Sequence, residues 1–295
     1  MIAMSYSIVT DTSANLPTPW LKANDVTVIP FCYTINGREM ACMDTEAFNG
    51  TAFYTAMRNG LGVTTSQINP QAYIDNFEPL LKAGQDILFV GMSSGISGSY
   101  QSAQMAMVQL RESYPEREFR LVDTLGASLG EGILVMRAVE YKHAGLDLSE
   151  TARRLLALRR NMCQIFMVDD LMFLKKTGRV SGAVALVGTM LQIKPLLKGN
   201  EKGQIVTYAK ARGRRKAIEA LAKHYDELVV DAPGQVVGIA HADCERDADL
   251  LATLLMRNHP PKQILTVMYE PVTGSHVGPG TLALFFLADS DVRSK

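Results

Sequence analysis

The sequence predicts a two-domain α/β protein. Its first half alternates β-rich runs with segments of helical periodicity, which is the pattern of a parallel sheet flanked by helices. Beyond residue 160 the expected strands come in pairs and longer hairpins, which is typical of a mixed α+β sheet. The chain of 295 residues is long enough for two domains. We therefore expect an N-terminal α/β domain over residues 1–160 and a C-terminal α+β domain over residues 161–295.

In the N-terminal half, Gly, Pro and Asn separate the expected elements. Strands are expected over residues 6–10, 26–35 (interrupted at Pro30), 86–92 and 119–123. Apolar residues at helical spacing predict helices over residues 47–59, 70–81, 99–113 and 133–143, and Asp147 begins a further one. Residues 63–70 form a polar segment, and residues 93–98 form a Ser/Gly loop. The alternation predicts parallel strand pairing.

In the C-terminal half, the spacing of the elements changes. Strands are expected over residues 163–168, 193–197, 204–210, 236–241, 263–269 and 282–288. Helices are expected over residues 170–176, 183–191, 214–228 and 247–257. We expect residues 274–280 to form a Gly-rich loop before the last strand.

The composition argues against several classes of protein. Lys and Arg together number 30, as do Asp and Glu, so the chain lacks the basic excess of a nucleic-acid-binding protein. No apolar run approaches the roughly 20 residues that span a bilayer, and the N-terminus does not read as a signal peptide. The four cysteines and five histidines lack metal-ligand spacing. We expect a cytoplasmic protein without a bound metal.

The stretch Gly91–Ser99 is the strongest candidate for a binding site. A buried strand leads into a loop of glycines and serines, and a helix starts at Ser97 or Ser99. The N-terminus of a helix carries unsatisfied N–H groups and partial positive charge, which suits an anion. An ordinary turn with capping serines is the alternative. The loop has neither the lysine of a P-loop nor the glycine spacing of a dinucleotide site.

Other polar groups in loops each have two interpretations. Thr65 and Ser66 either cap a helix or donate to the same ligand, and His276 is either structural or an anion ligand whose charge changes near neutral pH. Arg179 suits either a surface ion pair or an anion clamp. The basic run Lys210–Lys216 is either a solvated face or a docking patch. We find no convincing catalytic constellation.

A series of motifs along the whole chain resembles the DegV family of bacterial fatty-acid-binding proteins. The motifs include IVTDTSANLP (8–17), TSQ (65–67), SSGISGSYQSA (93–103), DDLMFLKKTGRVSG (169–182), KARGRRKA (210–217) and TGSHVGPG (273–280). Their number and order make the resemblance specific. One departure is Ile68, where the family usually has proline after TSQ.

The resemblance implies a long-chain fatty acid in a tunnel between the two domains. By family pattern, Thr65 and Ser97 hold the carboxylate, and Arg179 and His276 lie near the head group. Two further serines, Ser66 and Ser94, complete the candidate ligand-binding set.

The resemblance also implies a lipid-binding carrier and not an enzyme, without catalytic residues, metal or cofactor apart from the fatty acid. A separate ATP-dependent kinase subunit would phosphorylate the presented carboxylate, and the acyl-phosphate would feed phospholipid synthesis. Arg212 matches a family arginine that docks this kinase. The alternative is a phosphoryl-transfer or nucleotide-binding enzyme that uses the loop 91–99. The lack of a loop lysine and of a carboxylate pair for Mg²⁺ argues against it.

Overall fold

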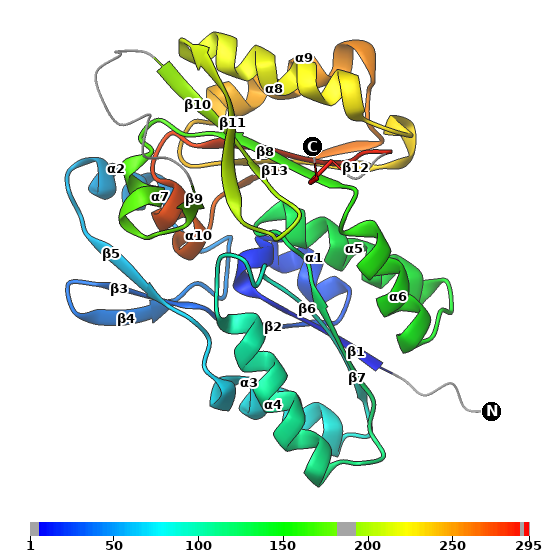
Figure 1. The fold of residues 1–295 in the computed structure, drawn as a ribbon. Helices are drawn as coiled ribbons and strands as arrows, with labels where there is room; N and C mark the ends of the chain where they lie inside the picture. Colours follow the sequence, from blue (N-terminus) through cyan, green and yellow to red (C-terminus); the bar gives the residue numbers. More distant parts are fainter. Residues whose placement is uncertain (1–5, 182–192, 290–291, 295) are drawn as a thin grey trace. The chain divides into compact units, whose positions relative to one another are not determined.

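The protein folds into two compact units, each with its own sheet and buried core (Figure 1). A computed structural model describes residues 6–181, 193–289 and 292–294. The first unit comprises Met1–Phe48 and Thr64–Arg159, and the second comprises Asn49–Val63 and Arg160–Lys295. The predicted fold class is confirmed, because the first unit has a parallel sheet flanked by helices and the second a mixed sheet.

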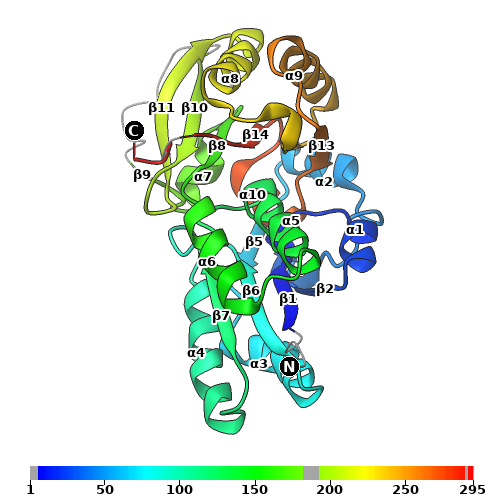
Figure 2. The same ribbon diagram turned by 90° about the vertical axis from the view of Figure 1, so that its right-hand side faces the viewer.

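The first unit is built on a four-stranded parallel sheet with the strand order β2-β1-β6-β7. Helices α3 and α4 cover one face of this sheet and α5 and α6 cover the other, as Figures 1 and 2 show. Because both faces are covered, the central strand β6 carries a continuous apolar run, and all of its residues are buried. The elements are β1 Tyr6–Asp11, α1 Thr18–Ala23, β2 Val26–Ile29, α3 Pro70–Lys82, β6 Asp86–Gly91, α4 Ser99–Ser113, β7 Phe119–Asp123, α5 Leu129–His143 and α6 Leu148–Leu158.

A second, three-stranded sheet with the order β4-β3-β5 differs from the expectations. The strand expected over residues 26–35 is two strands, β2 and β3 Cys32–Ile35. The β4 strand Arg38–Ala41 was not expected, because all four residues are exposed and no apolar alternation marks it. The polar segment after Gly62 contains a strand, β5 Val63–Ser66.

Two helix boundaries also differ from the sequence-based expectations. Helix α5 starts at Leu129, four residues before the expected start, because the small residues of its first turn carry no apolar periodicity. The expected Gly-rich loop over residues 274–280 is in large part the helix α10 Pro271–Val277. Glu270 caps this helix by accepting N–H bonds from Val272 and Thr273, both at 2.6 Å. The helix expected over residues 183–191 lies outside the described residues.

The second unit is built on a seven-stranded mixed sheet with the order β13-β12-β14-β8-β10-β11-β9. Strand β12 is parallel to β13, β11 is parallel to β9, and the remaining pairs are antiparallel. The elements are α2 Gly50–Arg58, β8 Met162–Met167, α7 Met172–Lys176, β9 Val180–Ser181, β10 Ile193–Gly199, β11 Ile205–Arg212, α8 Arg214–Leu228, β12 Val236–His241, α9 Glu245–Asn258, β13 Gln263–Met268, α10 Pro271–Val277 and β14 Leu282–Leu287.

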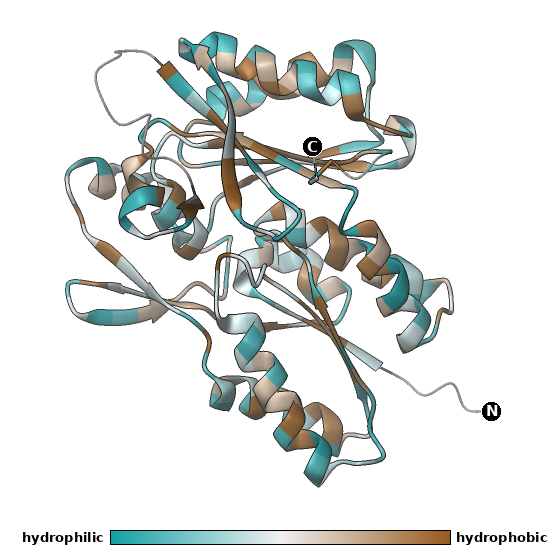
Figure 3. Ribbon diagram, viewed as in Figure 1, coloured by the Kyte–Doolittle hydropathy of each residue, from teal (hydrophilic) through white to brown (hydrophobic). Residues whose placement is uncertain are grey.

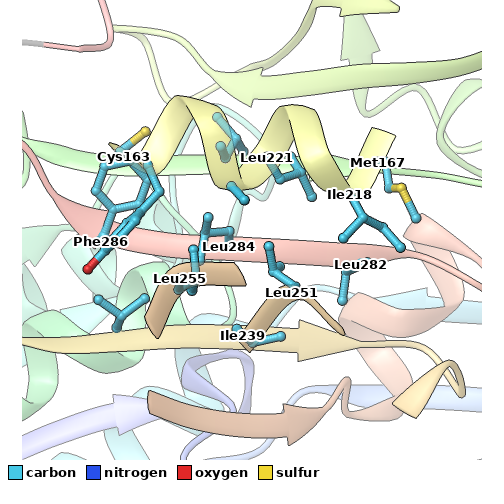
Figure 4. Packing of buried hydrophobic residues seen from close by; sticks show 14 of the residues in the cluster. Cys163, Met167, Ile218, Leu221, Ile239, Leu251, Leu255, Leu282, Leu284 and Phe286 are labelled. Carbon is cyan, nitrogen blue, oxygen red and sulfur yellow. The ribbon is translucent and has the colours of Figure 1, made fainter. Parts of the chain in front are cut away.

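The core of the second unit lies between its sheet and the helices α8 and α9. Figure 4 shows Leu221 of α8 and Leu251 of α9 facing Leu284 of β14. Tyr225 packs edge-on against Phe286, with the ring centroids 5.1 Å apart. Figure 3 shows that α8 and α9 each carry both apolar and polar residues, as expected of helices with one face on a core. Helices α7 and α10 lie on the other side of this sheet (Figure 2).

Among the described residues, no helix combines the length and the apolar character that a membrane span requires. The four cysteines are free thiols.

Candidate ligand-binding site

The Ser/Gly loop lies at the point where the strand order of the first unit reverses. From β1 the chain goes to β2 on one side, and it later returns to β6 on the other side of β1. In open parallel sheets, ligands bind outside the carboxyl ends of the strands at such a switch point. The loop that follows β6, residues 92–98, therefore occupies the place where this fold forms a binding site.

Two buried aspartates, at the ends of the two strands that flank β6, hold this loop. Asp11, at the end of β1, accepts the N–H of Met92 at 3.1 Å. Asp123, at the end of β7, accepts the N–H of Ser94 at 3.2 Å and its hydroxyl at 2.6 Å. The loop conformation therefore follows from side chains at the ends of β1 and β7 as well as from its own glycines.

The segment that carries Thr65, the end of β5 and the residues just after it, lies against the loop that carries Ser97. The N–H of Ile68, just after β5, donates to Ser99 Oγ at 3.0 Å. The Gln67 side chain packs directly over Gly98, where a β-carbon would lie 2.2 Å from Gln67 Oε1. The structure thus brings two of the predicted hydroxyl-bearing segments together within the first unit.

The hydroxyl of Ser97 is hydrogen-bonded within its own loop. It donates to Ser99 Oγ at 3.0 Å, and its oxygen accepts the N–H of Ser99 at 3.2 Å. Serine hydroxyls rotate readily, so a ligand that binds Ser97 would compete with Ser99 for this proton. Helix α4 begins at Ser99, as expected.

The other two predicted serines have different surroundings. The hydroxyl proton of Ser94 points to the Asp123 carboxylate, so this side chain cannot donate to a second anion without giving up that bond. Ser66 is the exposed last residue of β5, and Thr65 before it is partly buried. All four hydroxyl residues belong to the first unit, and their roles toward a ligand stay predictions.

In the second unit, helices α7 and α10 bring Arg179 and His276 near each other. The backbone at Gly278, which ends α10, has φ +82°, and a β-carbon there would lie 2.4 Å from the ring of Phe173 in α7. Burial and, to a smaller extent, the positive charge of Arg179 together lower the pKa of His276 to about 4. This pKa leaves His276 neutral at pH 7, and its role toward a ligand stays a prediction.

The basic run Lys210–Lys216 contains two kinds of residue. Arg212, at the end of β11, is exposed, and Arg215 in α8 is exposed and pairs with Glu219 one turn later at 3.0 Å. These two residues fit the expected solvated face or docking patch.

Arg214 does not belong to that solvated face. Its guanidinium donates to Asp169 at 2.7 Å, to Asp247 at 2.5 Å and to the carbonyl of Gly280 at 2.8 Å. It joins the segment after β8, the start of α9 and the loop after α10. The planar fork of arginine suits several such bonds, so Arg214 positions the segment that follows His276.

Sequence reasoning missed the residues that support the site. Asp11, Ser13 and Glu131 form a buried network beneath the Ser/Gly loop. Asp11 and Ser13 lie in the motif at residues 8–17, and Glu131 lies just before the helix expected over residues 133–143, but neither position suggested a role in the site. Among the described residues there is no group of three or more His, Cys, Asp and Glu that could hold a metal ion.

Comparison with known proteins places this site in a known fold. A model described as the DegV family matches residues 5–289. The chain belongs to the DegV family. A DegV domain-containing protein of Clostridium perfringens is 36% identical over 97% of this chain and 98% of the relative, and one of Lactococcus lactis is 32% identical with the same coverage.

Solved structures of DegV proteins match nearly the whole chain. A fatty-acid-binding DegV family protein from Thermus thermophilus superimposes with a TM-score of 0.87 at 30% identity, over 97% of this chain and all of that chain. DegV of Bacillus subtilis, a fatty acid binding protein, gives a TM-score of 0.82 at 26% identity with the same coverage. These DegV structural neighbours bind fatty acids.

The distinction between Arg214 and Arg215 can be tested with matched substitutions. Arg214→Lys keeps the charge but cannot form the three bonds of the fork, so we expect a loss of about 1–3 kcal/mol in the stability of the second unit. Arg215→Lys changes an exposed neighbour and should stay within about 0.5 kcal/mol. Urea unfolding measures both, and hydrogen exchange localises the change to peptides around residues 274–280. Equal effects of the two substitutions would contradict the assigned role.

Proposed function

We propose that this protein binds a long-chain fatty acid and presents its carboxylate to a separate ATP-dependent kinase, which converts it to an acyl-phosphate. The observation that carries the proposal is the meeting of the Thr65 and Ser97 segments at the switch point of the parallel sheet. The fatty acids bound by the structural neighbours from Thermus thermophilus and Bacillus subtilis support the class of ligand.

The hydroxyl groups suit a single carboxylate better than a polyphosphate. A carboxylate has two oxygens, and the hydroxyls of Thr65 and Ser97 are neutral donors that suit a singly charged group. Nucleotide-binding loops add a lysine and a metal ligand to balance several negative charges, and residues 91–99 contain no lysine. We therefore favour fatty acid binding over a phosphoryl-transfer enzyme.

The tail and the head group of the fatty acid differ in how much binding free energy they contribute. Burying the roughly 14 methylene groups of a sixteen-carbon acid is worth on the order of 11 kcal/mol, at about 0.8 kcal/mol per group. The loss of motion on binding offsets much of this energy. A hydrogen bond to a charged group contributes about 1.5–3 kcal/mol. In this proposal the tail sets the affinity, and Thr65 and Ser97 orient the carboxylate for reaction.

The kinase partnership goes beyond the binding of a fatty acid. A carrier would overcome the low solubility of a long-chain acid, and its phosphorylation would feed phospholipid synthesis. The exposed position of Arg212 at the end of β11 supports a role in docking. The roles expected for Arg179 and His276 near the head group, and a tunnel for the tail, stay predictions.

The bound ligand can be tested by extraction. Organic extraction of protein purified from a bacterial host should yield about one fatty acid per chain, and mass spectrometry of the intact protein should show the matching added mass. The mass of the adduct identifies the ligand. Protein that stays empty after incubation with fatty acid, or that binds a nucleotide instead, would contradict the proposal.

The head-group assignment can be tested by removing each hydroxyl. We expect Thr65→Ala and Ser97→Ala each to lower kcat/KM for kinase-dependent acyl-phosphate formation by roughly 10- to 100-fold, which corresponds to about 1.5–3 kcal/mol. The amount of extracted fatty acid should change far less, because the tail dominates affinity. The exposed residues Thr253 and Ser113 provide matched alanine controls. Normal phosphorylation with both site variants would show that other residues hold the carboxylate.

A further inference from the structure

Two fully buried carboxyl groups meet at one serine hydroxyl beneath the Ser/Gly loop. Ser13 Oγ lies 2.6 Å from Asp11 Oδ1 and 2.5 Å from Glu131 Oε2. Asp11 is 1% exposed, and Ser13 and Glu131 are 0% exposed. Asp11 ends β1, Ser13 lies in the short 3-10 helix η1 Thr12–Ala14, and Glu131 lies in the first turn of α5. The three residues therefore join the two sequence segments that flank the carboxyl end of the sheet.

A count of protons shows that this arrangement needs one carboxylic acid. A serine hydroxyl has one proton and can donate it to only one of the two carboxyl groups. If both were ionised, the other contact would set two oxygen lone pairs against each other at hydrogen-bond distance. A proton on one carboxyl resolves this conflict, because that group then donates to Ser13 Oγ while Ser13 donates to the other.

The surrounding donors decide which carboxyl carries the proton. Both oxygens of Asp11 face backbone N–H groups, since Oδ1 accepts from Ser13 at 2.9 Å and Oδ2 accepts from Met92 at 3.1 Å. An N–H group can only donate, so Asp11 must accept on both oxygens and is the ionised partner. Among the described residues, no N–H group donates to Glu131: its Oε1 lies 2.9 Å from Thr10 Oγ1, which also lies 2.8 Å from the Val90 carbonyl, and its Oε2 faces Ser13. The Glu131 carboxyl also lies within hydrogen-bonding reach of Asp11. Hydroxyl groups can accept as well as donate.

We propose that Glu131 is a neutral carboxylic acid at neutral pH, and that the chain of hydrogen bonds Glu131–Ser13–Asp11 positions the Ser/Gly loop through the N–H of Met92. Glu131 donates to Ser13, Ser13 donates to Asp11, and the Asp11 carboxylate holds the residue that starts the loop. The positioning role rests on the proposed function, since this loop carries Ser97. The place of the proton does not depend on it.

The environment favours this distribution of charge. Burial raises the pKa of Glu131 well above its usual range, and the charge of Asp11 raises it further. Burial also raises the pKa of Asp11, but its bonds from Ser13 and Met92 oppose the shift. The phenol of Tyr73, from α3, is the further titratable group whose pKa responds to both carboxyls. Within the described residues, no salt bridge reaches Asp11 or Glu131 to compensate a second negative charge.

The sign of the pH dependence follows from the raised pKa of Glu131. An unfolded glutamate loses its proton near pH 4.3, whereas the folded protein keeps it. The stability that this proton contributes is complete below that pH and is lost as the pH rises toward the folded pKa. In this window Glu131 makes the unfolding equilibrium constant rise by about tenfold per pH unit.

Substitution of each carboxyl by its amide tests the proposal in the full-length protein. Glu131→Gln keeps a donor for Ser13 and an acceptor for Thr10, so it mimics the neutral acid. Asp11→Asn places an N–H₂ group against a backbone N–H in either amide orientation. Glu140→Gln, an exposed glutamate on the same helix, is the matched control.

Infrared spectroscopy and unfolding at pH 5–8 give the first readouts. We expect a carbonyl band of a protonated carboxylic acid at pH 8 in the wild type, lost in Glu131→Gln and kept in Glu140→Gln. The unfolding equilibrium constant of Glu131→Gln, relative to wild type, should fall by about tenfold per pH unit. A wild type without the acid band, or a band that survives in Glu131→Gln, would overturn the placement of the proton. The infrared result decides where the proton lies even if the Asp11→Asn protein fails to fold.

Hydrogen exchange of the Met92 amide tests the positioning role. We expect exchange at Met92 to accelerate at least tenfold in Asp11→Asn, with no change in Glu140→Gln. Unchanged exchange in a folded Asp11→Asn protein would overturn the role of Asp11 toward the loop. None of these readouts uses fatty acid, so an empty wild-type protein would contradict the proposed function without deciding the place of the proton.

Discussion

The candidate site depends on carboxylates buried at the carboxyl ends of β1 and β7, the parallel strands on either side of β6. The carboxylate oxygens of Asp11 and Asp123 accept hydrogen bonds from backbone N–H groups of the Ser/Gly loop and of the turns beside it, at 2.9–3.2 Å. A buried carboxylate is stable only where such donors surround it. The same bonds that stabilise the charges therefore fix the loop, and the loop fixes where Ser97 stands beside the Thr65 segment.

The second unit uses a cation for a similar purpose. Arg214 links Asp169, Asp247 and the carbonyl of Gly280, so that three chain segments converge on one guanidinium. Close packing of Gly278 against Phe173 holds α10 next to α7. The result is a neutral His276 within electrostatic reach of Arg179. In each unit, buried or partly buried ionic groups thus hold a segment that carries or adjoins a candidate ligand residue.

The sequence was most informative where the signal is local. Apolar periodicity predicted the alternation of strands and helices in the first unit, and the buried strand before the Ser/Gly loop was correctly placed. It failed where polar residues form regular structure, as in β5, or where glycines form a helix, as in α10. The sequence could not predict contacts between residues that are far apart in the chain. Ser13 and Glu131 are 118 positions apart, and only the fold makes them neighbours. Nor could the sequence tell that Arg214 is bound on three sides while Arg215 is exposed.

The central claim is that the hydroxyls of Thr65 and Ser97 hold the carboxylate of a fatty acid. Carbon-13 NMR of a fatty acid labelled at its carboxyl carbon observes that group directly in the complex. We expect one bound resonance, distinct from free acid, that shifts in Thr65→Ala and in Ser97→Ala but not in Thr253→Ala. A bound resonance that none of these substitutions moves would place the head group elsewhere and contradict the account.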